Sequence, residues 1–106
     1  MDNNLDQIEL VKNERKRRFE LEVNGFLGFI NYGDFGGGNY ALVHTEIDPA
    51  LEGKGVGKVL VLKTLNYIKN EGKKILPYCP FVFAYIKRHP EWKHLVDENF
   101  EGYSQL

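Results

Sequence analysis

Glycines occupy the alternate positions 53, 55 and 57, between a strand-like segment and the start of a helix-like one. Glycines let backbone N–H groups close on a phosphate, and a helix N-terminus adds the positive end of its dipole. Lys54 and Lys58 stand where that dipole disfavours cations, which an anionic ligand would explain. The alternative is a tight strand-to-helix turn, for which one or two glycines suffice. The predicted anion-binding residues are Gly53, Lys54, Gly55, Val56, Gly57 and Lys58.

The spacing of this loop argues against two common nucleotide sites. A Walker A loop has Gly, four residues and then Gly-Lys-Ser/Thr, but counting back from Gly57-Lys58 places Glu52 at the first glycine, and Val59 follows the lysine. The dinucleotide fingerprint G-x-G-x-x-G would have Lys58 or Leu60 as its last glycine. An NTPase and a dinucleotide-binding enzyme are both disfavoured.

The N-terminal half has the pattern of three strands. Apolar and polar residues alternate over Arg18–Val23, the period of a half-buried strand. Asn24-Gly25 is the strongest two-residue hairpin signal, and Phe26–Tyr32 is apolar enough for a central strand. After a flexible loop over residues 33–39, Tyr40–Ile47 supplies the third strand. We expect an antiparallel meander.

The C-terminal half has the pattern of a β-loop-α-β unit. The spacing of apolar residues predicts a helix over Gly55–Glu71, and Gly72 stands at the position of a helix C-cap. The short apolar segment Lys74–Cys79 predicts a strand parallel to Tyr40–Ile47, because a helical crossover joins the two. The predicted fold class is α/β, of the α+β kind.

Two prolines divide the remainder of the chain. Pro80 is placed to start a helix over Phe81–Arg88, and Pro90 stops or kinks it before a last short turn. Residues 97–106 are expected to form a loosely held tail.

The segment EGKGVG resembles the pyrophosphate-binding motif of the GCN5-related N-acetyltransferase superfamily, Gln/Arg-x-x-Gly-x-Gly/Ala. Gly55 and Gly57 take the glycine positions, and Glu52 departs from the motif at the Gln/Arg position. HTEIDPALEGKGVGKVL and PYCPFVFAYIKRHPEW together are similar to a small, single-domain subfamily, and the match covers about residues 15–96. The resemblance implies a compact fold of this superfamily, acetyl-CoA as cosubstrate, and acetyl transfer to an amine.

The resemblance also implies where coenzyme A lies. The pyrophosphate rests on the N–H groups of residues 53–58, and the pantetheine arm slots between two parallel strands that splay apart. The thioester then lies between residues 46–48 and residues 76–79, so Ile47 and Asp48 are expected to bind the coenzyme. Arg88 and His89 either reach its adenosine or phosphate end or cap a helix.

Acetyl transfer needs a base for the ammonium, stabilisation of an oxyanion and an acid for the departing thiolate. His44 and Glu46 share one face of the third strand and are candidates for the base, or they form a hydrogen-bonded pair at a sheet surface. Tyr85 lies near the place where many superfamily members carry a tyrosine acid, or it is a core aromatic. Cys79 is a buried small residue, a residue lining the acetyl site, or an acyl-accepting nucleophile at a helix start.

The acceptor side of the site is expected to be open. Longer superfamily members wall it with an N-terminal strand–helix–helix segment, which a hairpin meander replaces here. The acceptor is then an exposed amine on a large partner such as a protein, unless a dimer closes the site or there is no catalysis. The favoured function is N-acetyl transfer to an unidentified amine. The alternatives are a coenzyme A-binding or acyl-CoA-binding module without turnover, and an interaction domain whose glycines are structural.

Charge and length limit the remaining classes. The 106 residues predict one domain, 1–106, with a core of about 15–96. A net charge of −1 gives no attraction for nucleic acid or anionic membranes, and the basic run Lys12–Arg18 is interpreted as a solvated lead-in to a strand. No segment approaches the roughly 20 apolar residues that span a bilayer. Monomer and weak dimer are equally compatible with the sequence.

The start, MDNNLDQIEL, lacks the pattern of a secretory signal, which predicts a cytoplasmic protein. The single cysteine, Cys79, excludes an internal disulfide and a cysteine-built zinc site. The three histidines have no close paired spacing, so no metal is expected.

Overall fold

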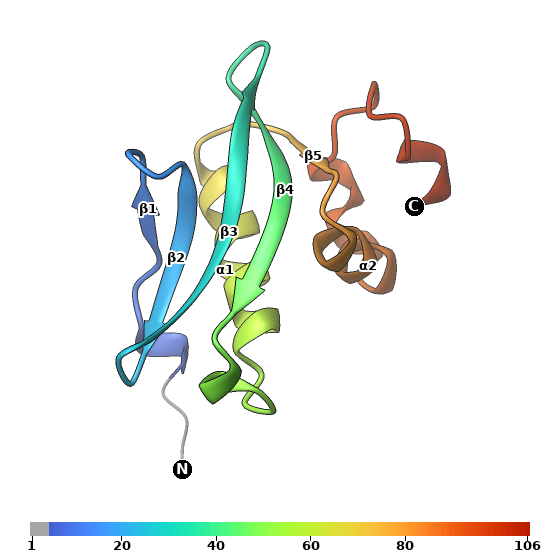
Figure 1. Ribbon diagram of the computed structural model, residues 1–106. Helices are drawn as coiled ribbons and strands as arrows, with labels where there is room; N and C mark the ends of the chain where they lie inside the picture. The colour runs from blue at the N-terminus through green and yellow to red at the C-terminus, as the bar shows by residue number, and fades with distance from the viewer. Residues whose placement is uncertain (1–4) are drawn as a thin grey trace.

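A five-stranded sheet in the spatial order β1-β2-β3-β4-β5 forms the centre of the protein in the computed structural model, which describes residues 5–106 (Figure 1). The strands are β1 Val11–Asn13, β2 Arg18–Val23, β3 Phe26–Phe35, β4 Asn39–Ile47 and β5 Ile75–Pro77. Strands β1 to β4 are antiparallel, and β5 is parallel to β4. The helices are α1 Val56–Asn70 and α2 Pro80–Arg88, with 3-10 turns η1 Leu5–Gln7, η2 Pro49–Leu51, η3 Pro90–Leu95 and η4 Tyr103–Gln105. The predicted mixed α/β fold is confirmed.

The hairpin between β2 and β3 turns at Asn24-Gly25, as predicted. Its φ angles are 53° and 84°, and a type I′ turn requires both to be positive. Strand β3 is longer than expected, because pairing with β4 continues to Phe35 and leaves only residues 36–38 as the loop. Cross-strand pairing therefore overrides the turn preference of Gly33 and Asp34.

The predicted helix over residues 55–71 corresponds to α1, whose C-terminus is closed by Gly72. The N–H of Gly72 donates to the Lys69 carbonyl at 3.0 Å, and the N–H of Lys73 donates to the Ile68 carbonyl at 3.2 Å. Gly72 has a φ of 73°. These two bonds and the left-handed residue form a Schellman cap, which satisfies the last carbonyl groups of the helix.

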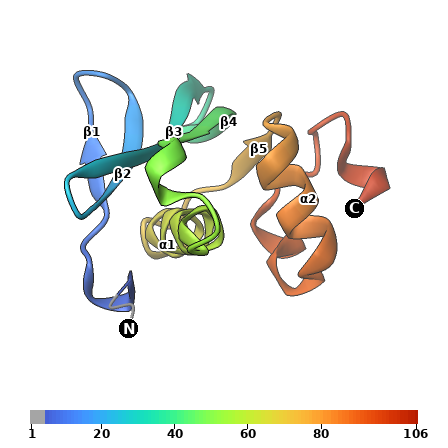
Figure 2. The ribbon, with the colours of Figure 1, turned by 60° about the horizontal axis from the view of Figure 1, so that its bottom comes forward.

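Helix α1 packs on one face of the sheet, which we call the inner face (Figure 2). Buried side chains on this face and on α1 form the core, among them Phe19, Leu21, Ile30, Leu42, Leu60, Leu65 and Ile68. Within residues 5–106, no helix lies over the opposite, outer face of β2 and β3 (Figure 2). Helix α2 lies beside β5, beyond the edge of β4 (Figure 1).

The basic run Lys12–Arg18 differs from the expected solvated lead-in. Its first residues pair with β2 as strand β1, and the Lys12 side chain is only 17% exposed. Lys12 lies opposite the core residue Phe19, so it points to the inner face, where its ammonium donates to the Tyr40 hydroxyl at 2.8 Å. The interpretation was wrong for Lys12 because the partner that buries it is distant in sequence.

Residues 97–106 are not a loose tail. The N–H of Asp97 donates to the Ile75 carbonyl at 2.9 Å, so the segment continues the sheet edge beside β5. Phe100 is 7% exposed, and its ring lies 5.1 Å from that of Tyr78 and 6.3 Å from that of Phe83, measured between centroids. This prediction was wrong because apolar contacts with α2 hold the segment. None of the helices formed by residues 5–106 has both the length and the apolar character that crossing a bilayer requires.

Candidate functional site

Strands β4 and β5 pair over only part of β4. The parallel register covers Tyr40, Ala41 and Leu42, and the last bond of the ladder runs from the Cys79 N–H to the Leu42 carbonyl at 2.8 Å. Within the described chain, residues 43–47 have no strand partner on the β5 side. The two parallel strands therefore separate after Leu42, as the family resemblance implies.

A β-bulge marks the point of separation. Leu42 lies opposite Tyr32 and His44 lies opposite Asn31, so Val43 is an extra residue in β4. A bulge bends its strand and increases the local twist. The bend therefore begins where pairing with β5 ends.

Beyond the bulge, a gap opens between β4 and β5, and backbone groups of β4 face it. The N–H of Asp48 donates to the Leu27 carbonyl at 3.0 Å, so position 48 directs its backbone groups towards β3. In an antiparallel pair this direction alternates, so Glu46 and His44 also face β3, whereas Ile47 and Thr45 face away from it. The amide groups of Thr45 and Ile47 are therefore available along the side of β4 that β5 leaves.

His44 and Glu46 share one face of β4, as predicted, and it is the outer face. The His44 Nε2 and Glu46 Oε1 atoms are 3.3 Å apart, and the side chains are 59% and 63% exposed. Thr45 lies opposite the core residue Ile30 and so points to the inner face. The structure thus joins the two candidate bases into one solvent-accessible pair beside the gap.

Cys79 bridges the separated strands. It is 3% exposed, and its Sγ lies 3.1 Å from the Oγ1 of Thr45. Cys79 is also the N-cap residue of α2, without a side-chain bond to the helix. The thiol is buried at the point where β4 and β5 diverge, which leaves all three sequence interpretations of Cys79 open.

Helix α1 begins with unpaired backbone donors. Gly53 and Gly55 have φ angles of 77° and 75°, a left-handed conformation that side chains disfavour. The N–H of Lys54 donates to the Leu51 carbonyl at 3.3 Å, so this donor is satisfied. Within residues 5–106 no backbone acceptor pairs with the other loop and first-turn N–H groups, which are those of Gly53, Gly55, Val56, Gly57 and Lys58. They are the orphan donors of a helix N-terminus, extended by one glycine.

Some charged side chains around this loop are exposed to solvent, whereas one is already engaged in a hydrogen bond. Lys54, Lys58 and Glu52 are exposed. Asp48, predicted to bind the coenzyme, accepts a hydrogen bond from the Ala50 N–H at 2.9 Å and caps η2. Its carboxylate therefore holds the turn that leads into the loop.

Phe81 was missed from the sequence, although it lies against the loop. A Cβ added to Gly57 would come within 2.8 Å of the Phe81 Cζ atom. Phe81 is nevertheless 45% exposed. The N-terminal turns of α1 and α2 therefore meet at Gly57, which explains why a glycine suits this position. The available signal was an apolar ring directly after the helix-starting Pro80.

Tyr85, Arg88 and His89 lie further along α2. The Tyr85 and His89 rings are 4.3 Å apart between centroids, and burial, with a smaller contribution from Glu91, raises the pKa of Tyr85. Arg88 is the last residue of α2 and is roughly 10 Å along the helix from Phe81. His89 occupies the C-cap position, which agrees with the capping interpretation. Tyr85 therefore lies about one helical turn beyond Phe81, whereas Arg88 and His89 lie at the C-terminal end of α2.

Within residues 5–106 no three His, Cys, Asp or Glu side chains are placed to hold a metal ion together.

Known proteins are similar to this chain in sequence. A family model described as GCN5-related N-acetyl-transferase matches residues 18–95. The protein NATD1 of Xenopus tropicalis is 30% identical over 83 residues, which cover 76% of each chain. The Homo sapiens NATD1 protein is 28% identical over 85 residues, covering 78% of this chain and 75% of its own. The Gallus gallus NATD1 protein is 31% identical and covers 76% of each chain. The match contains the splayed strands, the glycine loop and both helices, and the chain therefore belongs to the GCN5-related N-acetyltransferase family.

Proposed function

We propose that this acetyltransferase domain binds acetyl-CoA along the β4 gap and the glycine loop, and transfers the acetyl group to an amine on a large partner. The observation that carries the proposal is the continuity of two sets of free backbone groups. Thr45 and Ile47 present amides along the gap, and residues 53 and 55–58 present free N–H donors at the start of α1. A pantetheine arm contains amides, and a pyrophosphate is an anionic acceptor, so one extended ligand matches both sets.

The pyrophosphate end fits the loop on electrostatic grounds. Each anion contact at an exposed helix N-terminus contributes roughly 0.3–1 kcal/mol, and several N–H groups act together here. Lys54 and Lys58 add positive charge from the surface. Glu52 is exposed, so its carboxylate is free to point into solvent instead of towards the phosphates.

In the direct route, the His44 imidazole takes a proton from the acceptor ammonium and Glu46 stabilises the resulting imidazolium. The amine nitrogen attacks the thioester carbonyl and the C–S bond breaks. The attacking nitrogen releases its second proton to the coenzyme thiolate, which leaves as a thiol. Burial raises the pKa of Tyr85, which favours the protonated phenol that an acid for the departing thiolate requires.

In the indirect route, Cys79 accepts the acetyl group first. Its thiolate displaces the coenzyme thiolate and forms an S-acetyl thioester, which the acceptor amine then cleaves to an amide and restored Cys79. The position of the buried thiol beside Thr45, where β4 and β5 diverge, supports this route. A Cys79→Ala protein that still becomes acetylated with acetyl-CoA would exclude this route.

A large acceptor is favoured by the open outer face. His44 and Glu46 lie on the part of the sheet that no described helix covers, and both are more than half exposed. The same exposure supports the second candidate, a coenzyme A-binding module without turnover, because no wall excludes water from the pair.

Two measurements test these functions. Titration of the labelled protein with coenzyme A should shift the backbone amide NMR signals of residues 53–58, and a lack of saturable shifts there would exclude both candidates. Thiol release from acetyl-CoA with a panel of amines and lysine peptides separates them, because a binding module would show none.

Variants of the two candidate bases are compared with a variant of a distant carboxylate. His44→Gln and Glu46→Gln should lower kcat roughly 100-fold without changing coenzyme A affinity. Glu22→Gln, an exposed outer-face change on β2, serves as the control and should leave kcat unchanged. Equal rates for Glu46→Gln and Glu22→Gln would remove Glu46 from the proposal.

A further inference from the structure

A second polar site lies at the opposite end of β4 and α1. A pocket of about 270 Å³ is lined by Lys12, Glu14, Arg17, Tyr32, Asp34, Gly38 and Tyr40. Helix α1 is roughly 20 Å long, and Glu71 at its C-terminal end adjoins the pocket, so the site is distinct from the glycine loop. At about 30 Å³ for each water molecule, the pocket has the volume of roughly nine waters. This volume suits a small metabolite.

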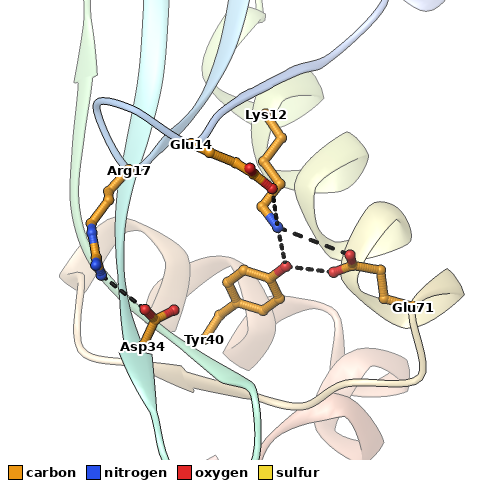
Figure 3. Close-up of polar contacts among 6 residues, drawn as sticks. All are labelled: Lys12, Glu14, Arg17, Asp34, Tyr40 and Glu71. Atoms are coloured by element: carbon orange, nitrogen blue, oxygen red, sulfur yellow. Dashed lines mark hydrogen bonds and ion pairs between the residues drawn. The ribbon is translucent and has the colours of Figure 1, made fainter.

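Lys12 forms the floor of the pocket with unused donor capacity. Figure 3 shows its ammonium between Tyr40, Glu14 and Glu71. The nitrogen lies 2.8 Å from the Tyr40 hydroxyl, but 3.6 Å and 4.0 Å from the carboxylates of Glu14 and Glu71. Only one of its three N–H groups therefore has a partner at full hydrogen-bond strength.

The Tyr32 hydroxyl is a second unused donor. Tyr32 is 7% exposed, and within residues 5–106 no hydrogen-bond partner is found for its hydroxyl. Burial raises the pKa of Tyr32, and the charges of Lys12, Glu14, Asp34 and Arg17 act on the same phenol. The hydroxyl thus lies among the charged groups of the pocket and stays protonated. The hydroxyl oxygen is not fully enclosed, because among the described residues only the Oγ1 of Thr64 is a fully buried side-chain oxygen without a partner. The Tyr32 hydroxyl is therefore open to a ligand in the pocket that it lines.

The rim of the pocket carries carboxylates. Asp34 pairs with Arg17 at 2.9 Å, and both side chains are more than half exposed (Figure 3). Glu14 is 78% exposed, and its 3.6 Å approach to Lys12 leaves it free to turn outward. The two cations and two carboxylates of the lining sum to no net charge.

We infer that this pocket binds a small zwitterion of the amino-acid type. The ligand carboxylate lies against the Lys12 ammonium and the Tyr32 hydroxyl, and the ligand ammonium lies against the carboxylates of Glu14 and Asp34. Donors on the floor require an acceptor, and an anion satisfies a lysine best. A ligand with both charges preserves the neutrality of the lining, whereas a single charge leaves one half of the pocket unmatched.

The test uses three ligands that differ by one group. Alanine carries both charges, propionate lacks the ammonium, and ethylamine lacks the carboxylate. In NMR titrations of the full chain, alanine should cause saturable shifts at Tyr32 and Arg17, with at least tenfold higher affinity than propionate or ethylamine. These ligands should not move the signals of residues 53–58, so the outcome is independent of coenzyme A binding.

Two variants make the test specific. Tyr32→Phe should weaken alanine binding at least fivefold while leaving the unfolding midpoint unchanged, because the hydroxyl has no partner to lose. Glu14→Gln should weaken alanine binding but not propionate binding. The inference is overturned if alanine does not bind saturably, if propionate binds as well as alanine, or if Tyr32→Phe leaves the affinity for alanine intact.

Discussion

The two ends of α1 satisfy their polar groups in opposite ways. At the N-terminal end, glycines leave backbone N–H groups without partners and the side chains around them are exposed. At the C-terminal end, the Schellman cap uses the last carbonyls, and Tyr40 donates to Glu71 at 2.5 Å while accepting from Lys12. The first end leaves backbone hydrogen-bonding capacity unused, which the proposed coenzyme A site would employ. The second uses side chains to fasten β1 and β4 to the helix.

Tyr40→Phe should have the largest effect on stability. The variant removes the hydroxyl that joins Lys12 and Glu71, and hydrogen bonds to charged groups contribute roughly 1.5–3 kcal/mol. We expect the free energy of unfolding to fall by about 2 kcal/mol, which lowers Tm by roughly 10 °C in a domain of this size. Denaturant unfolding measures the loss, and coenzyme A affinity should not change. Tyr32→Phe is the matched control, and equal stability of the two variants would contradict the contrast between the ends.

The same hydroxyl predicts a pH dependence confined to the C-terminal end. Burial, reinforced by the hydrogen bond to Glu71 and opposed by that from Lys12, raises the pKa of Tyr40 to about 12. A tyrosine in the unfolded chain titrates near pH 10. Because the folded pKa is the higher one, this contribution is complete below about pH 10 and is lost as the pH rises through about 12.

Denaturant unfolding between pH 9 and pH 12 should therefore show a steeper decline for the wild-type protein than for Tyr40→Phe. Tyrosinate absorbance should show one late-titrating group that this variant lacks. Parallel declines of stability would rule out Tyr40 as the source.

Glycine substitutions should separate the ends by function. Gly55 and Gly72 have φ angles of 75° and 73°, and a Cβ at either position would meet nothing within 4 Å. Gly55→Ala and Gly72→Ala should each lower the free energy of unfolding by about 1–2 kcal/mol through the left-handed backbone. Only Gly55→Ala should weaken coenzyme A binding, by about tenfold in calorimetry. Equal affinities of the two variants would show that the loop geometry does not serve the ligand.

Thr45→Val should have the smallest effect on stability. It removes a contact between a hydroxyl and the Cys79 thiol, which is a weak hydrogen bond worth at most about 1 kcal/mol. We expect an unfolding free energy within about 0.5 kcal/mol of the wild-type value, with Thr45→Ser as the control that keeps the hydroxyl. If Thr45→Val lowered the free energy of unfolding as much as Tyr40→Phe, the contact between Thr45 and Cys79 would stabilise the protein as much as the hydrogen bonds of Tyr40 do.

Local signals predicted most of the fold. The Asn24-Gly25 turn, the helix with its Gly72 cap, and the parallel strand after the crossover each depend on residues close together in sequence. The glycine loop was found for the same reason. Each of these features depends on residues that are close to it in the sequence.

Features that depend on distant partners were missed. Strand β1 is three residues long and has no periodicity, and Lys12 is buried by Tyr40, 28 residues away. The packed C-terminal segment had a signal that was overlooked, because Phe100, Tyr103 and Leu106 recur every third residue.

The bulge at Val43 determines which face of the sheet the later side chains of β4 point to. Tyr40 and Leu42 point to the core, and strict alternation would continue with His44 and Glu46. The extra residue inverts the count, so the even-numbered side chains beyond it face solvent and Thr45 faces inward. Loss of this one residue would make β4 a regular strand, with His44 and Glu46 still facing solvent, but it would remove the bend at the point where β5 leaves. A change of length in residues 36–38 would alter neither the faces nor the bend. Deletion of Val43 should therefore preserve the two faces of β4 while changing the path of the strand beside the gap, whereas changes of length at the β3–β4 turn should affect neither.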